Sequence, residues 1–97
     1  MEFDFIDKDI NQVVKDISVY VKIIPNTSLK VCNGGWIQIL ISKLGTSTLS
    51  FKLSKNNAGT HLILGDQEIA WLHRAHISEV KTKIKAALRS LGGIEVM

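Results

Sequence analysis

The turn residues between positions 27 and 71 constrain the fold of this chain more than any other feature. Four turn signals divide the segment, and apolar and polar residues alternate between them as they do in β-strands. Because successive side chains point to opposite faces of a sheet, each loop length decides whether neighbouring strands share one apolar face. The four turns are Asn33–Gly35, Leu44–Thr46, Asn56–Gly59 and Gly65–Asp66.

Loops of three, three, four and two residues place the apolar side chains of all these strands on one face. A two-residue first loop would set Lys30 against Ile37, and a shorter second loop would set Ile41 against Thr48. We therefore predict a five-stranded antiparallel meander. Its expected cross-strand pairs are Leu29 with Ile39, Val31 with Ile37, Ile41 with Leu49, Ile39 with Phe51, Ile37 with Leu53, Leu53 with Leu62, Phe51 with Leu64, Leu62 with Ile69, and Thr60 with Trp71.

Amphipathic helices are predicted on either side of this meander. The first has Asp7 or Asp9 as its N-cap and ends before Pro25, and the second has Ser78 as its N-cap and ends at Gly92–Gly93. Both show apolar residues at the three- and four-residue spacing of a helix. The apolar stripes are Ile6, Ile10, Val13, Val14, Ile17 and Val21 in the first helix, and Val80, Ile84, Ala87, Leu88 and Leu91 in the second.

These elements predict an α+β fold, a two-layer sandwich in the order α-β-β-β-β-β-α with both helices on the apolar face of the sheet. A chain of 97 residues leaves no room for a second core of comparable size, so we expect one domain over residues 1–97. Its 45% hydrophobic content and single proline argue against disorder.

The opposite face of the predicted sheet carries the candidate binding site. Lys30, Gln38 and Lys52 are expected to line up across three strands, and no remaining element covers the apolar side chains beside them. Trp36 is the expected anchor, since a large ring with one polar edge suits an interface; alternatively, it folds beneath a chain end. The predicted partner-binding residues are Trp36, Leu40, Ile63, Leu72, Lys30, Gln38 and Lys52.

No catalytic or metal-binding motif is present in the sequence. Cys32 is the single cysteine, and the three histidines are His61, His73 and His76, without the spacing of a CxxC or HExxH site. A Gly-x-Ser-x-Gly elbow is also missing, and the glycine-rich turns lack the lysine of a phosphate loop. We therefore expect no enzyme activity, no bound metal and no cofactor.

Charge is distributed unevenly along the chain, whose net charge is +3. Residues 1–20 carry five acids against two lysines, whereas the remainder carries ten bases against four acids. Lys81, Lys85 and Arg89 follow one another at four-residue intervals and form a basic stripe on the second predicted helix. Such a stripe can track phosphates, although the solvated side of an ordinary amphipathic helix has the same pattern.

We predict a non-enzymatic interaction module, a small adaptor, inhibitor or accessory subunit, which binds a protein partner or itself as a homodimer through the outer sheet face. The alternative is a nucleic-acid-binding protein that combines the basic stripe with a Trp and Lys sheet face. The apolar runs are too short to span a membrane, the N-terminus is acidic, and the lone Cys32 cannot form an internal disulfide. We therefore expect no membrane partner and a cytoplasmic location.

Overall fold

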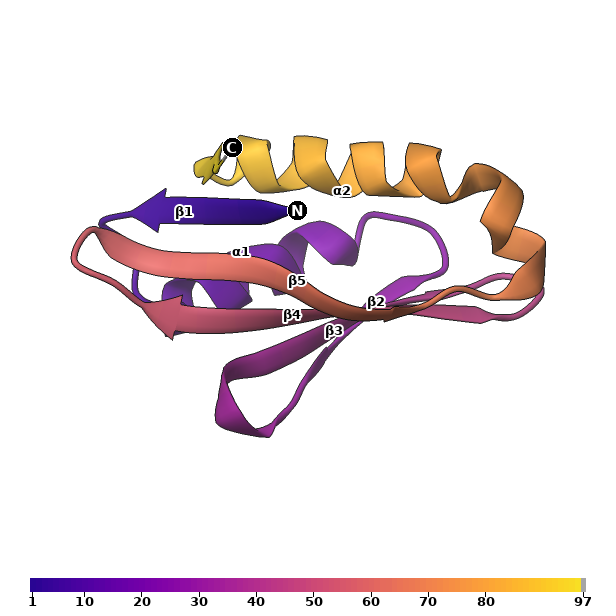
Figure 1. The fold of residues 1–97 in the computed structure, drawn as a ribbon, viewed down its shortest axis with the longest axis horizontal. Helices are drawn as coiled ribbons and strands as arrows, with labels where there is room; N and C mark the ends of the chain where they lie inside the picture. The colour runs from indigo at the N-terminus through magenta and orange to yellow at the C-terminus, as the bar shows by residue number, and fades with distance from the viewer. Residues whose placement is uncertain (97) are drawn as a thin grey trace.

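Two helices pack on one face of a six-stranded antiparallel sheet in the computed structural model, which describes residues 1–96 (Figure 1). The α+β fold predicted from the sequence is thereby confirmed. The strand order is β2-β3-β4-β5-β1-β6. The elements are β1 (Glu2–Ile6), α1 (Ile10–Val21), β2 (Thr27–Val31), η1 (Asn33–Gly35), β3 (Trp36–Ser42), β4 (Thr46–Lys55), β5 (Gly59–Glu68), η2 (Trp71–His76), α2 (Ile77–Ser90) and β6 (Gly93–Glu95).

Two of the predicted strand registers are confirmed. Val31 pairs with Ile37 between β2 and β3, around a glycine-containing loop in which Gly34 and Gly35 have positive φ angles of 72° and 81°. An added Cβ at Gly35 would lie 2.7 Å from the carbonyl oxygen of Leu53, so this loop needs glycine for space as well as for its backbone angles. Between β4 and β5, the predicted pairs of Leu53 with Leu62 and Phe51 with Leu64 are also present.

The predicted register between β3 and β4 is wrong by two residues. Ile39 pairs with Leu49 and Ile37 with Phe51, because the turn occupies residues 43–45, one position earlier than predicted. Leu44 adopts a left-handed φ of 54° there, which the sequence pattern does not indicate. A shift of two residues leaves every side chain on its predicted face, so the alternation of apolar residues cannot detect it.

The predicted fifth strand of the meander is also wrong. Strand β5 continues through Gly65 and Asp66 with a β-bulge, where these two residues stand opposite Ser50 of β4. Ile69 therefore does not return to pair with Leu62, and Trp71 lies in η2 with 77% of its surface exposed.

The place beside β5 belongs to β1, a strand that is absent from the predicted meander. Phe3 pairs with Leu62 and Phe5 with Thr60, and short β6 pairs with the other edge of β1. Helix α1 consequently begins at Ile10, where Asp9 accepts a hydrogen bond from the backbone N–H of Gln12 and acts as the predicted N-cap. Ile6 lies in β1 instead of the helix stripe.

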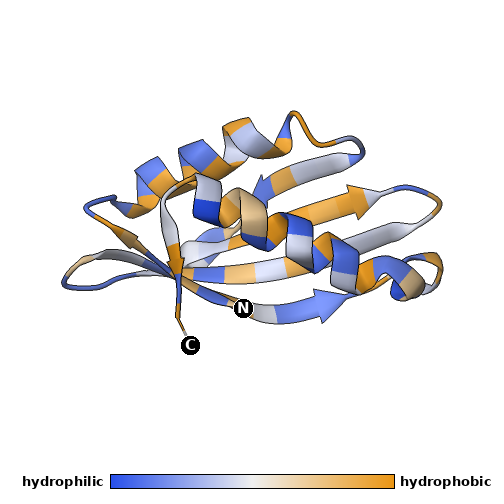
Figure 2. Cartoon of the chain, turned by 90° about the horizontal axis from the view of Figure 1, so that it is seen from above, coloured by the Kyte–Doolittle hydropathy of each residue, from blue (hydrophilic) through white to orange (hydrophobic). Residues whose placement is uncertain are grey.

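The core lies between the sheet and the two helices, which cross the same side of the sheet in Figure 2. Phenylalanines of β1 and β4 contribute its largest fully buried side chains. The predicted inner-face residue Val31 is instead 64% exposed, because it lies on the edge strand β2. The buried hydrophobic side chains are Phe3, Phe5, Val13, Ile17, Val21, Ile37, Ile39, Leu49, Phe51, Leu53, Leu62, Ile84, Ala87 and Leu88.

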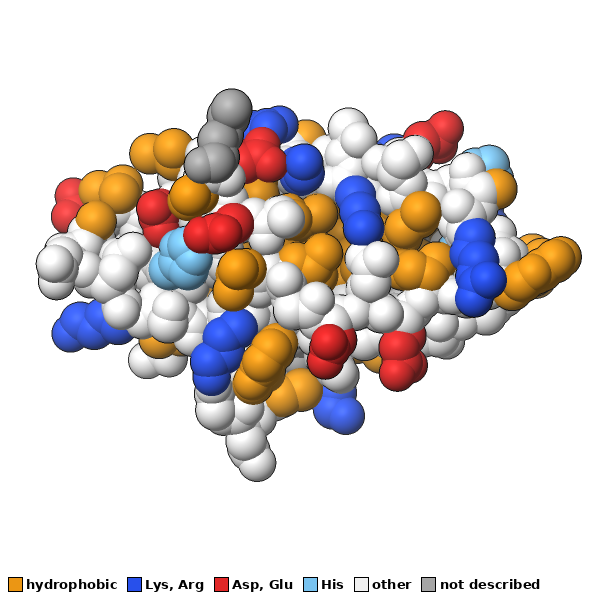
Figure 3. Space-filling model, in the orientation of Figure 1, with side chains coloured by type: hydrophobic (Ala, Val, Ile, Leu, Met, Phe, Trp, Pro, Cys, Tyr) orange, Lys and Arg blue, Asp and Glu red, His pale blue; other side chains and the backbone are white. Residues whose placement is uncertain are grey.

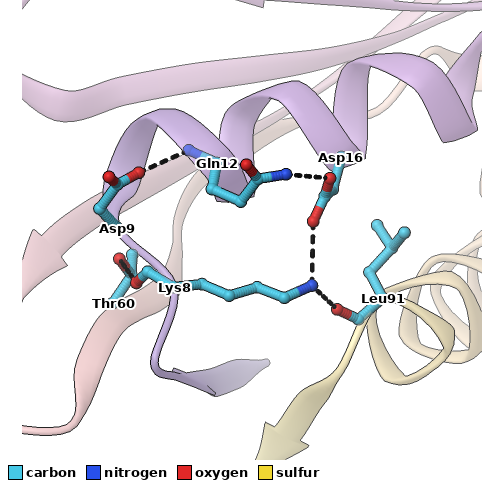
Figure 4. A network of polar contacts seen from close by, with 6 residues as sticks. All are labelled: Lys8, Asp9, Gln12, Asp16, Thr60 and Leu91. Atoms are coloured by element: carbon cyan, nitrogen blue, oxygen red, sulfur yellow. Dashed lines mark hydrogen bonds and ion pairs between the residues drawn. The ribbon is translucent and has the colours of Figure 1, made fainter.

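A polar network joins the two helices at the end of this core (Figure 4). The ammonium group of Lys8 donates to Asp16 Oδ2 at 2.9 Å and to the carbonyl oxygen of Leu91 at 2.6 Å. The side-chain amide of Gln12 donates to the other oxygen of Asp16 at 2.7 Å. Hydrogen bonds from Lys8 and, secondarily, Gln12 lower the pKa of Asp16 below its usual value of 3.8.

This network predicts that the stability of the folded chain decreases in acid through Asp16. Because the pKa of Asp16 is lower in the folded state, its contribution to stability is present above about pH 4 and is lost as pH falls through the lowered pKa. We expect Asp16→Asn to decrease stability at pH 6 and to flatten the loss of stability between about pH 4 and pH 2. Urea midpoints measured across this range test the prediction, and an unchanged pH dependence would contradict it.

Candidate protein-interaction face

The side of the sheet opposite the two helices is not covered by any element within residues 1–96, and we call it the open face (Figure 2). Its side chains alternate along each strand with the buried core residues, so the apolar pattern of the core also determines which residues point outward. In Figure 1 the tip of the β2–β3 hairpin turns away from the helices, toward this side. The open face is built mainly by Lys30, Trp36, Gln38, Leu40, Ser50, Lys52, Ile63, Asp66 and Glu68.

Trp36 occupies a defined position on the open face. It pairs with Lys52 of β4, whose ammonium group lies 5.6 Å from the centroid of the indole ring and also donates to the carbonyl oxygen of Gly34. On its other side the ring lies against Gly65, where an added Cβ would be 2.7 Å from the indole carbon Cζ3. The ring is partly exposed and oriented by a lysine on one strand and a glycine on the next.

Replacing Gly65 with alanine is expected to displace the Trp36 ring. The φ angle of Gly65 is not in the left-handed region, so the substitution acts through the contact with the ring and not through backbone strain. We expect a changed emission maximum and increased quenching by acrylamide, with the fold retained. The measurement uses a Trp71→Phe background, because Trp71 is exposed and would contribute its own fluorescence. Unchanged Trp36 emission would show that the ring does not rest on Gly65.

Beside Trp36, two adjoining depressions form a furrow across the open face. The first has a volume of about 260 Å³ and lies between Cys32, Trp36 and Asp66. The second has a volume of about 220 Å³ and extends toward Glu68. They share Gln38, Ser50 and Asp66, so the furrow follows the bulge in β5. The furrow therefore presents both an aromatic ring and hydrogen-bonding side chains in one concave strip.

The basic and acidic side chains of the open face lie on different strands. Lys30 and Lys52 lie on β2 and β4, whereas Asp66 and Glu68 lie on β5. Within residues 1–96, Lys30 and Asp66 make no ion pair and both are exposed. On the side of the molecule seen in Figure 3, acidic and basic side chains are scattered among apolar ones, without a large region of one sign.

A histidine and two carboxylates occupy the β1 end of the same face. His61 Nδ1 lies 2.7 Å from Asp4 Oδ1, and His61 Nε2 lies 3.0 Å from Glu2 Oε2. The amide of Asn56 also donates to Asp4, at 3.2 Å. These contacts hold β1 to β5 and occupy both ring nitrogens, so His61 serves here as a link between strands.

Of the seven predicted partner-binding residues, Leu72 alone does not lie on the open face. It lies in η2, 53% exposed, because the predicted fifth strand does not form. The expected alignment of Gln38 with Lys52 is wrong as well: Gln38 pairs with Ser50, and Lys52 pairs with Trp36. The six predicted residues that the structure brings to one face are Lys30, Trp36, Gln38, Leu40, Lys52 and Ile63.

The predicted basic stripe lies in the other layer, on α2. Lys85 Nζ lies 3.1 Å from Glu95 Oε2, and Arg89 pairs with the other oxygen of the same carboxylate. Hydrogen bonds from Lys85 and Arg89 lower the pKa of Glu95. Two of the three predicted stripe residues thus share an acidic partner from β6, and Lys81 lies one turn before them.

A hydrogen-bonded serine and histidine lie outside the open face, and their geometry indicates a structural role. His73 Nε2 donates to the carbonyl oxygen of Lys43, which can only accept, and His73 Nδ1 shares a hydrogen bond with Ser47 Oγ. Ser47 Oγ in turn accepts from the backbone N–H of Ala70 at 2.9 Å. Ser47 is only 1% exposed, so this pair fastens η2 to the sheet and does not present a nucleophile to solvent.

A cleft of about 710 Å³ lies where α1 begins beside the β4–β5 loop. Two of its polar residues already serve local structure: Asp9 caps the helix, and Asn56 accepts from the backbone N–H groups of Ala58 and Gly59. Among residues 1–96, no three His, Cys, Asp or Glu side chains are arranged to hold a metal ion. In the same residues, neither helix has the length and apolar character needed to cross a bilayer.

Comparison with known protein families, with curated proteins and with solved structures gave no match to this chain.

Proposed function

We propose that this chain is a small non-enzymatic interaction module that binds a macromolecular partner through the open face. One observation carries the proposal: both helices pack on one side of the sheet, and the opposite side presents a partly exposed tryptophan beside a furrow. Tryptophan is enriched among the residues that contribute most to binding energy at protein interfaces. A cytoplasmic location belongs to the same proposal, because a reducing compartment suits the single free Cys32.

Protein is the favoured class of partner. The open face combines apolar side chains of Leu40 and Ile63 with charges of both signs, as interfaces between proteins do. Nucleic acid is the weaker candidate, because its two predicted contact regions lie in different layers: Trp36 and Lys52 are on the open face, and the basic stripe is on α2. A single nucleic-acid strand would have to pass around the molecule to reach both contact regions.

Site-specific photo-crosslinking in cells tests the proposal. A photoreactive amino acid replaces Ser50 in the centre of the furrow, and a matched control replaces Lys15, which is exposed on α1. We expect defined adducts from position 50 and few from position 15. Nuclease treatment identifies adducts with nucleic acid, which would support the weaker candidate. Equal, nonspecific labelling from both positions would contradict a binding role for the open face.

A further inference from the structure

We propose that a second copy of this chain binds to the open face, in an isologous dimer whose two-fold axis runs parallel to the strands, between β3 and β4. This inference rests on the proposed function and specifies its partner. The inference is based on the exposed Lys30 of β2 and the exposed Asp66 of β5, which lie on opposite sides of that line. A two-fold rotation about the axis exchanges β2 with β5, and β3 with β4.

The strand registers give this arrangement a specific ion pair. Lys30 pairs with Gln38, Gln38 pairs with Ser50, and Asp66 stands opposite Ser50 in the bulge, so these residues form one row across four strands. Rotation about the axis preserves the row and brings Lys30 opposite Asp66 of the partner subunit. Because the operation is two-fold, the same pair forms twice.

The rotation also concentrates apolar surface near the axis. Trp36 and Leu40 belong to β3, which borders the axis, whereas Lys30 and Asp66 are one strand farther out. An aromatic centre within a charged rim is the usual anatomy of a protein interface. Lys52 also borders the axis, but its ammonium group is turned onto the Trp36 ring and the carbonyl oxygen of Gly34. Repulsion between the two copies of Lys52 is thereby reduced.

The area of the open face suits a weak dimer. The four strands that the rotation exchanges, β2, β3, β4 and β5, are five, seven, ten and ten residues long. With about 3.3 Å per residue and about 4.8 Å between strands, they cover roughly 500 Å². A standard protein interface buries about 800 Å² on each partner. Because the open face is smaller than this, we expect a reversible dimer.

Sedimentation equilibrium with charge-reversal variants tests the geometry. We expect the wild-type chain to reach a mass twice the 10.8 kDa of one copy at micromolar to millimolar concentration. Lys30→Asp and Asp66→Lys should each weaken self-association at least about tenfold, since each places like charges together, and the double variant should recover most of it. Lys15→Asp, on the exposed side of α1, is the matched control and should leave the dimer unchanged.

The outcomes separate this inference from the proposed function. A wild-type chain that stays monomeric at millimolar concentration overturns the dimer, while heterologous adducts from position 50 would still support an interaction module. A dimer that both single reversals leave intact overturns the proposed axis. Circular dichroism of every variant confirms that lost association is not lost folding.

Discussion

Replacing Phe51 with alanine is expected to lower the free energy of unfolding by about 3–5 kcal/mol. Phe51 is fully buried in the middle strand β4, between Ile37 on β3 and Leu64 on β5. Removing its ring leaves a cavity between the sheet and the helices that the surrounding strands cannot close without shifting. Domains of this size are usually stable by about 5–15 kcal/mol, so the loss is a large fraction of the total.

Urea unfolding followed by far-ultraviolet circular dichroism measures the effect of Phe51→Ala. Ser54→Ala, an exposed change on the same strand, is the control and should stay within about 0.5 kcal/mol of wild type. If the alanine variant does not fold, Phe51→Leu keeps part of the buried volume and should give a smaller, measurable loss. A loss below about 0.5 kcal/mol for Phe51→Ala would place this residue at the surface.

A second large effect is expected at the start of the chain, where Phe3→Ala should also cost about 3–5 kcal/mol. Phe3 is fully buried, and its ring lies close enough to Gly93 that a Cβ there would be 3.1 Å away. The side chain therefore belongs to the core although it is only three residues from the N-terminus. Thermal or urea unfolding of the variant measures the loss.

Ile6→Ala is the matched control for Phe3→Ala. Ile6 lies on the same strand and is 47% exposed, so its truncation should have a much smaller effect. Equal effects of the two substitutions would mean that β1 does not pack on the core, and would contradict the six-stranded sheet.

Local patterns were sufficient to predict three of the four hairpins and which face of the sheet is buried. The loop around Gly34 and the β4–β5 loop fix their registers through loop length, and neighbouring apolar residues agree with both. Between β3 and β4 the same reasoning gave the correct faces with an incorrect register. The turn there depends on Leu44 in a left-handed conformation, which is uncommon for leucine.

Strand β1 was missed because its pairing is not local. Its partners, β5 and β6, lie more than fifty residues away in sequence, and no turn signal indicates them. A signal was nevertheless present: Phe3 and Phe5 alternate with Glu2 and Asp4, which is the two-residue period of a half-buried strand. The helical spacing that begins at Ile6 concealed it.

Gly65 shows that a glycine between apolar segments can indicate either a turn or a bulge within a strand. Followed by Asp66, it has the pattern of a two-residue turn, and on that pattern alone a hairpin is predicted there. In the structure it is a strand residue whose missing side chain gives room to Trp36. Isolated glycines inside strands often mark a bulge or a close approach, and here both occur. The furrow residues Ser50 and Asp66 were missed for the same reason, since the bulge brings them together.

The most direct test of the open face is hydroxyl-radical footprinting of the chain in dilute solution and in cells that express it. We predict that Trp36 and Ile63 are oxidised in dilute solution and protected in cells, where a partner covers them. Val19, which is 59% exposed on α1, is expected to be oxidised equally in both. Equal oxidation of Trp36 and Ile63 in the two conditions would contradict the account, because the open face would then have no partner.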